Sequence, residues 1–140
     1  MRKFRKGAYL LIAHGTRDEE GKSSFLQFVN EFRKAFPDRF VQPAFLELAK
    51  PDIQEGIEAC VEEGAEEIFV IPLMLFPGRH VNQDIPGQIQ EAKSRYPQLD
   101  FHYSGALALV PREGKRPSEP KMFELLLSKI ARLQERVPAS

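Results

Sequence analysis

The sequence lacks several features that mark secreted, membrane-spanning or nucleic-acid-binding proteins. Its single cysteine, Cys60, cannot form an internal disulfide, which suits a reducing cytoplasm. No apolar run approaches the ~20 residues of a membrane-spanning helix, and the apolar stretch after the basic N-terminus is too short for a signal peptide. The 20 basic and 20 acidic residues cancel, which argues against a broad nucleic-acid-binding surface. These absences predict a soluble, cytoplasmic protein with no nucleic-acid or membrane partner.

The most informative stretch is a long apolar run that begins at Ile68 and stops at Pro77-Gly78. A run rich in isoleucine, valine and phenylalanine is typical of a strand buried on both faces of a sheet. Because a Pro-Gly pair continues neither a strand nor a helix, the chain must turn there, and His80 follows the end of a central strand. A second apolar strand, at residues 9–13, ends at His14 in the same way.

The other segments repeat a strand–helix pattern. The strand at residues 40–46 contains Pro43, which cannot donate a ladder hydrogen bond, so this strand is predicted at a sheet edge. The strand at residues 99–103 alternates apolar with polar residues, which indicates the opposite edge. Helices are predicted to begin near Ser24, after Pro51, at Asp84–Pro86 and at about Lys121, and a mobile loop is predicted at about residues 111–120.

This pattern predicts a single α/β domain over residues 1–140. Right-handed crossovers make the sheet parallel and place helices on both of its faces. With the two most apolar strands inside, the strand order is 2-1-3-4. We therefore predict a three-layer sandwich built on a four-stranded parallel sheet.

Three side chains that can bind metals follow neighbouring strands of this sheet. The predicted order brings His14, Glu47 and His80 to the carboxyl edge, where parallel α/β proteins bind ligands. Two imidazoles and a carboxylate suit divalent cobalt, nickel, iron or zinc, and three protein ligands leave the coordination sphere open. The imidazoles could instead accept protons. A plainer interpretation is that both histidines hydrogen-bond their loops and that Glu47 pairs with Lys50.

Four further residues have two possible interpretations or a structural one. Arg17 and Arg79 adjoin the two histidines, and they are either ordinary surface charges or a bidentate grip on an anionic ligand rich in carboxylates or phosphates. His102 points away from the apolar face of its edge strand and is interpreted as solvent-facing. Cys60 lies on the apolar stripe of a helix, so we interpret it as a core residue and not as a nucleophile.

Four motifs carry a family resemblance, and their order and spacing make it specific. The chain resembles the small, single-lobe CbiX-type sirohydrochlorin cobaltochelatases of the class II tetrapyrrole chelatase family. The matching motifs are LIAHGTRD at 11–18, AFLELAKP at 44–51, IPLML at 71–75 and GRHVNQDIP at 78–86. The resemblance implies a chelatase-like fold and insertion of a divalent metal, Co²⁺ first with Fe²⁺ or Ni²⁺ as alternatives, into sirohydrochlorin for cobalamin or siroheme-type biosynthesis.

The same resemblance assigns roles to residues. It implies that His14 and His80 are catalytic and bind the incoming metal, and that Glu47 completes the metal site. Arg17 and Arg79 would bind the carboxylates of sirohydrochlorin, and an apolar wall for the ring would come from Leu73, Leu75 and Phe76. A homodimer is implied, with the metal as substrate and no permanently bound cofactor. No ATP is expected, because the sequence has no phosphate-binding Gly-x-x-x-x-Gly-Lys loop.

Two other functions compete with this interpretation. A histidine phosphatase would place Arg-His-Gly at the end of its first strand, but Ala13 stands where that arginine would be. A non-enzymatic carrier would bind the metal or the tetrapyrrole without accelerating insertion.

Overall fold

The computed structural model of the chain describes residues 6–73 and 79–103, and for residues 79–82 it describes the backbone alone. Strands and helices alternate along this part of the chain, as the sequence predicts. The elements are β1 (Gly7–Ala13), α1 (Glu19–Ala35), β2 (Phe40–Phe45), α2 (Ile53–Glu62), β3 (Glu67–Pro72), α3 (Arg79–Arg95) and β4 (Asp100–Tyr103).

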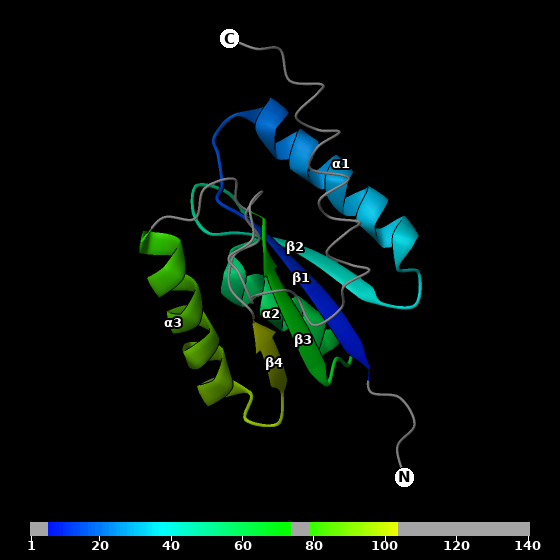
Figure 1. Cartoon of the computed structure of the whole chain (residues 1–140), viewed down its shortest axis with the longest axis vertical. Helices are drawn as coiled ribbons and strands as arrows, with labels where there is room; N and C mark the ends of the chain where they lie inside the picture. Colours follow the sequence, from blue (N-terminus) through cyan, green and yellow to red (C-terminus); the bar gives the residue numbers. More distant parts are fainter. Residues whose placement is uncertain (1–5, 74–78, 104–140) are drawn as a thin grey trace, which may run out of the picture.

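The four strands form one parallel sheet in the order β2-β1-β3-β4, which confirms the predicted topology (Figure 1). In the register of the sheet, Leu11 of β1 lies between Pro43 of β2 and Ile71 of β3. Pro43 is on the edge strand β2, where its missing N–H interrupts no ladder between two neighbours. The carboxyl ends of β2, β1 and β3 therefore lie side by side at one rim of the sheet.

Side chains of β1 alternate between two separate cores. Ala8, Leu10 and Ile12 face the core that α2 and α3 cover, whereas Tyr9 and Leu11 face the core under α1. The first core includes Ile53, Ile57 and Cys60 of α2 and Ile85, Ile89 and Ala92 of α3, and the second includes Phe28, Val29 and Phe32 of α1. Helices thus cover both faces of the sheet, and the predicted three-layer arrangement is confirmed.

Helix α1 begins earlier than the sequence analysis predicts. The capping-box pattern at Ser24 favours a start there, but Asp18 is the N-cap and its side chain accepts a hydrogen bond from the N–H of Glu20. The N–H of Asp18 in turn donates to Oγ1 of Thr16 (3.0 Å). Glu19 and Glu20 then lie in the first turn, where acidic groups are favoured by the helix dipole. The predicted start was wrong because Asp18 caps as well as serine does.

Helix α3 also begins earlier than predicted, at Arg79, and Pro86 lies inside it and not at its start. A proline inside a helix removes one backbone hydrogen bond and is unfavourable by roughly 3 kcal/mol or more. Ile85, Ile89 and Ala92 are buried against the sheet, and their packing offsets this cost. The longer helix places the backbone of His80 in its first turn.

A glycine caps the carboxyl end of helix α2, as predicted. Gly64 has φ +87°, a conformation that glycine adopts without strain. Its N–H donates to the carbonyl of Val61, and the N–H of Ala65 donates to that of Cys60. These two bonds satisfy carbonyls at the helix end that otherwise lack a partner within the helix.

Several predictions fall outside the described residues and stay predictions. They are the mobile loop at 111–120, the last helix at 121–136 and the extent of one domain over residues 1–140. No helix within residues 6–73 and 79–103 is long and apolar enough to cross a membrane.

Cys60 is fully buried in the core under α2, and burial raises the pKa of its thiol to about 12. At pH 8 only about one thiol in ten thousand would then be ionised, and the thiolate is the reactive form. We expect negligible reaction of the native protein with iodoacetamide and full reaction of Cys60 in denaturing urea, measured by mass spectrometry. Fast modification of the native protein would contradict the core assignment.

Candidate functional site

His14 and Glu47 meet at the carboxyl rim of the sheet. The Nε2–H group of His14 donates a hydrogen bond to Oε1 of Glu47 across 2.9 Å. Their side chains are 54% and 57% exposed, so the pair is open to solvent and to ligands. The predicted convergence of these two residues is confirmed. The alternative pairing of Glu47 with Lys50 is not what the structure shows, because the Lys50 ammonium lies near Asp52 and Glu55.

The backbones of the two residues are also joined. Beyond the last residues of β1 and β2, the N–H of Leu46 donates to the carbonyl of Ala13 (2.9 Å) and the N–H of Glu47 to that of His14 (3.0 Å). The parallel ladder therefore continues to the site residues themselves. The relative position of His14 and Glu47 is set by the sheet.

Gly15 permits the close approach of these two segments. It has φ +113°, and a Cβ atom built on it would lie 1.7 Å from the carbonyl oxygen of Glu47. A side chain at this position would push the loop after β1 away from Glu47. The glycine that follows His14 is thus required by the backbone contact beside the site.

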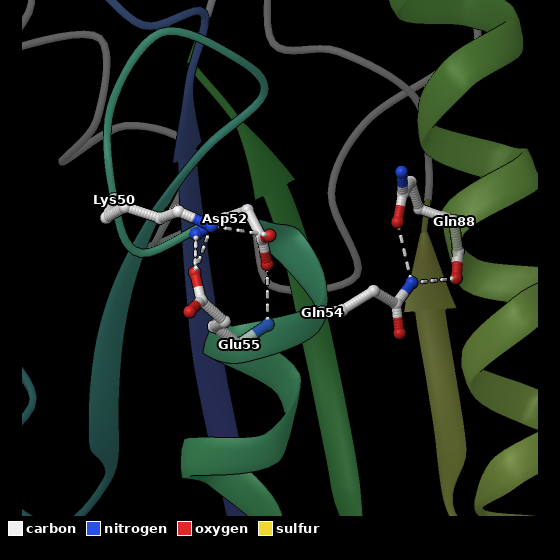
Figure 2. A network of polar contacts seen from close by, with 5 residues as sticks. All are labelled: Lys50, Asp52, Gln54, Glu55 and Gln88. Carbon is white, nitrogen blue, oxygen red and sulfur yellow. Dashed lines mark hydrogen bonds and ion pairs between the residues drawn. The ribbon is translucent and has the colours of Figure 1, made fainter.

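The loop that carries Glu47 is anchored at its far end as well. The N–H of Phe45 donates to the carbonyl of Pro51 (2.8 Å), which closes the loop on itself. Asp52 then caps α2 in a reciprocal arrangement, in which Glu55 N–H donates to Asp52 Oδ1 (2.8 Å) and Asp52 N–H donates to Glu55 Oε1 (2.9 Å) (Figure 2). A loop anchored at both ends holds Glu47 in one place.

Lys50 adds charge to this anchor. Its Nζ lies 3.4 Å from Oδ2 of Asp52 and 3.3 Å from Oε1 of Glu55. These contacts raise the pKa of Lys50, with the hydrogen bond to Glu55 as the largest cause. The pKa of the Asp52 carboxyl is lowered, mainly because it accepts the backbone N–H of Glu55.

A second contact in the same view ties α2 to α3. The side-chain amide of Gln54 donates to both the backbone oxygen (2.9 Å) and the side-chain oxygen (2.6 Å) of Gln88 (Figure 2). Helix α2 follows the Glu47 loop directly, and the first turn of α3 carries His80. Helices α2 and α3, which cover the same face of the sheet, are therefore held to each other.

His80, the third predicted ligand, follows strand β3, which lies next to β1 in the sheet, and its backbone is in the first turn of α3. The N–H of Leu73 donates to the carbonyl of Ile12 (2.7 Å), so the β1–β3 ladder also continues to the rim. The side chains of Arg79 and His80 lie outside the described residues, as do Leu75 and Phe76 entirely. The convergence of His80 with the other two ligands, the grip by Arg79 and the apolar wall stay predictions.

The other predicted site residues have varied surroundings. Arg17 is exposed in the segment between His14 and α1. Leu73 is half-buried and packs on the α1 side of the sheet with the cluster around Tyr9 and Leu11, so only part of its surface is left for a ligand. Among the side chains that the structure describes, no group of three or more His, Cys, Asp and Glu could hold a metal ion. Within that set, the rim provides the His14–Glu47 pair as two donors.

His102 differs in part from its prediction. It is 41% exposed, but its Nε2–H donates to Oε1 of Glu67 (2.8 Å) and its ring stacks on Phe69 with centroids 4.6 Å apart. Glu67 is the first residue of β3, at the opposite end of that strand from the rim. The contacts of His102 are thus structural, and the alternation of β4 by itself could not reveal them.

The fold and the rim define an α/β protein with a helix-covered parallel sheet and a paired imidazole and carboxylate at the carboxyl ends of adjacent strands. The chain belongs to the CbiX family, whose model matches residues 8–113.

Two relatives illustrate the similarity. A sirohydrochlorin ferrochelatase of Priestia megaterium is 40% identical over 96 residues, which cover 69% of this chain and 36% of that enzyme. A sirohydrochlorin cobaltochelatase of the same organism is 38% identical over 95 residues, which cover 67% of this chain and 30% of that enzyme. The chain thus spans about a third of the length of these two curated relatives.

A solved structure supports the same grouping. The sirohydrochlorin chelatase SirB from Bacillus subtilis subspecies spizizenii, in complex with cobalt, has a TM-score of 0.68 and 35% sequence identity. The similarity covers 74% of this chain and 44% of that one.

Replacement of Asp52 by alanine removes the cap of α2, and we expect a loss of about 1 kcal/mol in the free energy of unfolding at pH 7. The folded-state pKa of Asp52 lies below its reference value of 3.8, so its charge stabilises the fold above that value, and this part is lost as the pH falls through the folded-state pKa. Urea unfolding at pH 7 and at acidic pH tests this. Asp52→Asn is the control, because it keeps a capping oxygen but carries no charge. The difference in unfolding free energy between the wild type and this control should shrink in acid, and a difference that grows in acid would contradict the predicted pH dependence.

Replacement of Gly15 by alanine should lower the free energy of unfolding by about 2 kcal/mol or more, because of the positive φ and the contact with Glu47. Gly87→Ala is the matched control. A Cβ on Gly87, inside α3, would meet no atom within 4 Å, so this change should stabilise the protein by about 0.5–1 kcal/mol. Equal urea midpoints for the two variants would show that the approach at Gly15 is not tight.

Proposed function

We propose that this chain inserts a divalent metal ion into sirohydrochlorin without ATP. The observation that carries the proposal is the His14–Glu47 pair, held at the exposed rim of the sheet in a chain of the CbiX family. The names of its relatives, which include both a ferrochelatase and a cobaltochelatase, support the reaction class and leave the metal open. Cobalt is the metal we propose first, with iron and nickel as alternatives.

The geometry of the pair suits transient metal binding. Donor atoms about 2.1 Å from one ion and at right angles to each other lie about 3.0 Å apart. The 2.9 Å between His14 Nε2 and Glu47 Oε1 is therefore compatible with a hydrogen bond in the free protein and with shared coordination of the metal. For His14 to bind the metal through Nε2, the proton on Nε2 must first move to Nδ1 or to solvent, which frees the Nε2 lone pair. We propose His80, from the first turn of α3, as the third ligand. With three protein ligands, the ion keeps open positions through which the ring nitrogens can displace the protein.

The same donors can take up the protons that the reaction releases. When a divalent ion enters the ring, two pyrrole N–H bonds break, and the nitrogen electron pairs bind the metal. As each metal–protein bond breaks, a lone pair on the imidazole nitrogen or the carboxylate oxygen becomes free to accept one of those protons. We propose His14 as acceptor of at least one, with His80 as its catalytic partner. Metal release and proton uptake are then coupled at the same atoms.

Charge and apolar surface would hold the substrate. Sirohydrochlorin carries eight carboxylates, and we propose that Arg17 and Arg79 bind some of them at the edge of the ring. Leu73, Leu75 and Phe76 are the proposed wall against the ring face. A homodimer, a cytoplasmic location, the absence of a permanent cofactor and a place in cobalamin or siroheme-type biosynthesis belong to the same proposal.

Binding preference by itself does not select the metal. The affinity of a site with nitrogen and oxygen ligands rises from iron through cobalt to nickel for almost any arrangement. Selection among them therefore depends on the rates of insertion, which an assay with each ion measures directly.

His14→Ala and Glu47→Gln should each reduce the rate of metal insertion by about 100-fold or more, because each removes a metal donor and a proton acceptor. The measurement is the absorbance change of sirohydrochlorin with Co²⁺, Fe²⁺ or Ni²⁺. Glu58→Gln, an exposed change on α2, is the control and should leave the rate unchanged. Unchanged rates in both site variants would refute the site, and a wild-type protein that binds both substrates without exceeding the spontaneous rate would be a carrier.

A further inference from the structure

Leu48, the residue after Glu47, combines two unusual properties. Among the residues that the structure describes, Leu48 is the large hydrophobic residue that is exposed, at 51%. It is also the non-glycine residue with a positive φ, +67°, within the same ranges. An exposed leucine on its own needs no explanation, and a left-handed residue in a loop is usually Gly, Asn or Asp. The coincidence of the two at the rim does need one.

Neither the backbone conformation nor burial in the core accounts for a leucine at this position. The left-handed conformation brings Cβ close to the following carbonyl oxygen, so glycine or asparagine would suit the backbone better. Burial of the side chain in the core could offset that strain, but Leu48 is an exposed residue. Strained backbone conformations cluster at active sites and ligand-binding positions, so this residue is a candidate for ligand contact.

The surroundings of Leu48 prevent the strain from relaxing. Glu47 N–H is bonded to the His14 carbonyl on one side, and the Phe45–Pro51 bond closes the loop around the residue. Consecutive Cα atoms lie about 3.8 Å apart, so the Leu48 side chain originates next to a proposed metal donor. The backbone of Leu48 is therefore held next to Glu47, one of the proposed metal donors.

We propose that Leu48 contacts the face of the tetrapyrrole ring and sets the affinity for it. The inference rests on the proposed function. The four nitrogens that receive the metal lie at the centre of the ring and the carboxylates at its edge. A ring placed with its centre over His14 and Glu47 therefore presents pyrrole carbons, and not carboxylates, to a side chain adjacent to those donors. An apolar group there excludes water from the ring face, and this accounts for leucine where the backbone favours a small polar residue.

Leu48→Asn and Leu48→Gly test this contact, because both residues tolerate the left-handed conformation and remove the apolar surface. We expect folded variants with thermal stability equal to or above that of the wild type. The dissociation constant for metal-free sirohydrochlorin, from fluorescence titration, should rise about five- to tenfold, as should KM. The affinity for Co²⁺ alone should not change, because the metal donors remain. Leu48→Met keeps the apolar area and should restore most of the affinity for the ring.

An unchanged sirohydrochlorin dissociation constant in the asparagine and glycine variants would overturn the inference. So would a change of oligomeric state in light scattering without a change in that constant, because Leu48 would then contact a second copy of the chain. The proposed function fails separately, if the wild type binds sirohydrochlorin in a Leu48-dependent way but inserts no metal. If the wild type inserts metal and both variants keep the wild-type affinity for the ring, the inference about Leu48 fails and the proposed function stands.

Discussion

The continuation of the β1–β2 hydrogen-bond ladder past the ends of both strands is the interaction on which the site depends. It joins the backbones of His14 and Glu47, whose side chains are also hydrogen-bonded to each other. A hydrogen bond between two half-exposed side chains contributes little in water, because water competes for both groups. Here the sheet has already brought the two residues together, so little additional order is lost when the side chains pair. The geometry of the pair is a property of the fold.

The rim combines rigidity with exposure. Directly beneath it, Leu11 and Ile12 of β1 are fully buried, and Gly15 lets the following loop lie against Glu47. The capped start of α2 and the bond between Phe45 and Pro51 hold the second loop. Transient metal binding, as proposed for this rim, requires donors that are accessible to the ion and fixed in position. The structure meets both needs because it places exposed side chains on a backbone fixed by buried strands.

Long-range features of the fold could be predicted, whereas two helix starts could not. Apolar runs and Pro43 were sufficient to predict the strand order, because central parallel strands are continuously apolar, whereas edge strands tolerate proline and polar residues. The start of α1 was mistaken because Ser24 and Asp18 are both competent caps, and only the contacts of Thr16 and Glu20 favour Asp18. The predicted start of α3 was wrong because a proline usually lies in the first turn of a helix. Here the burial of Ile85 and Ile89 stabilises a helix that contains Pro86 in its interior.

By itself, the sequence determined the alternation of strands and helices, the parallel order of the sheet and the rim at which His14 and Glu47 appear, because each follows from local apolar periodicity and chain connectivity. Only the tertiary structure decided which partner each charged or polar side chain has: Glu47 binds His14 and not Lys50, and His102 binds Glu67. It also decided that Leu48 is left-handed and exposed. Such pairings join residues some thirty positions apart, and no local pattern can specify them, because they depend on strand register and loop closure in three dimensions.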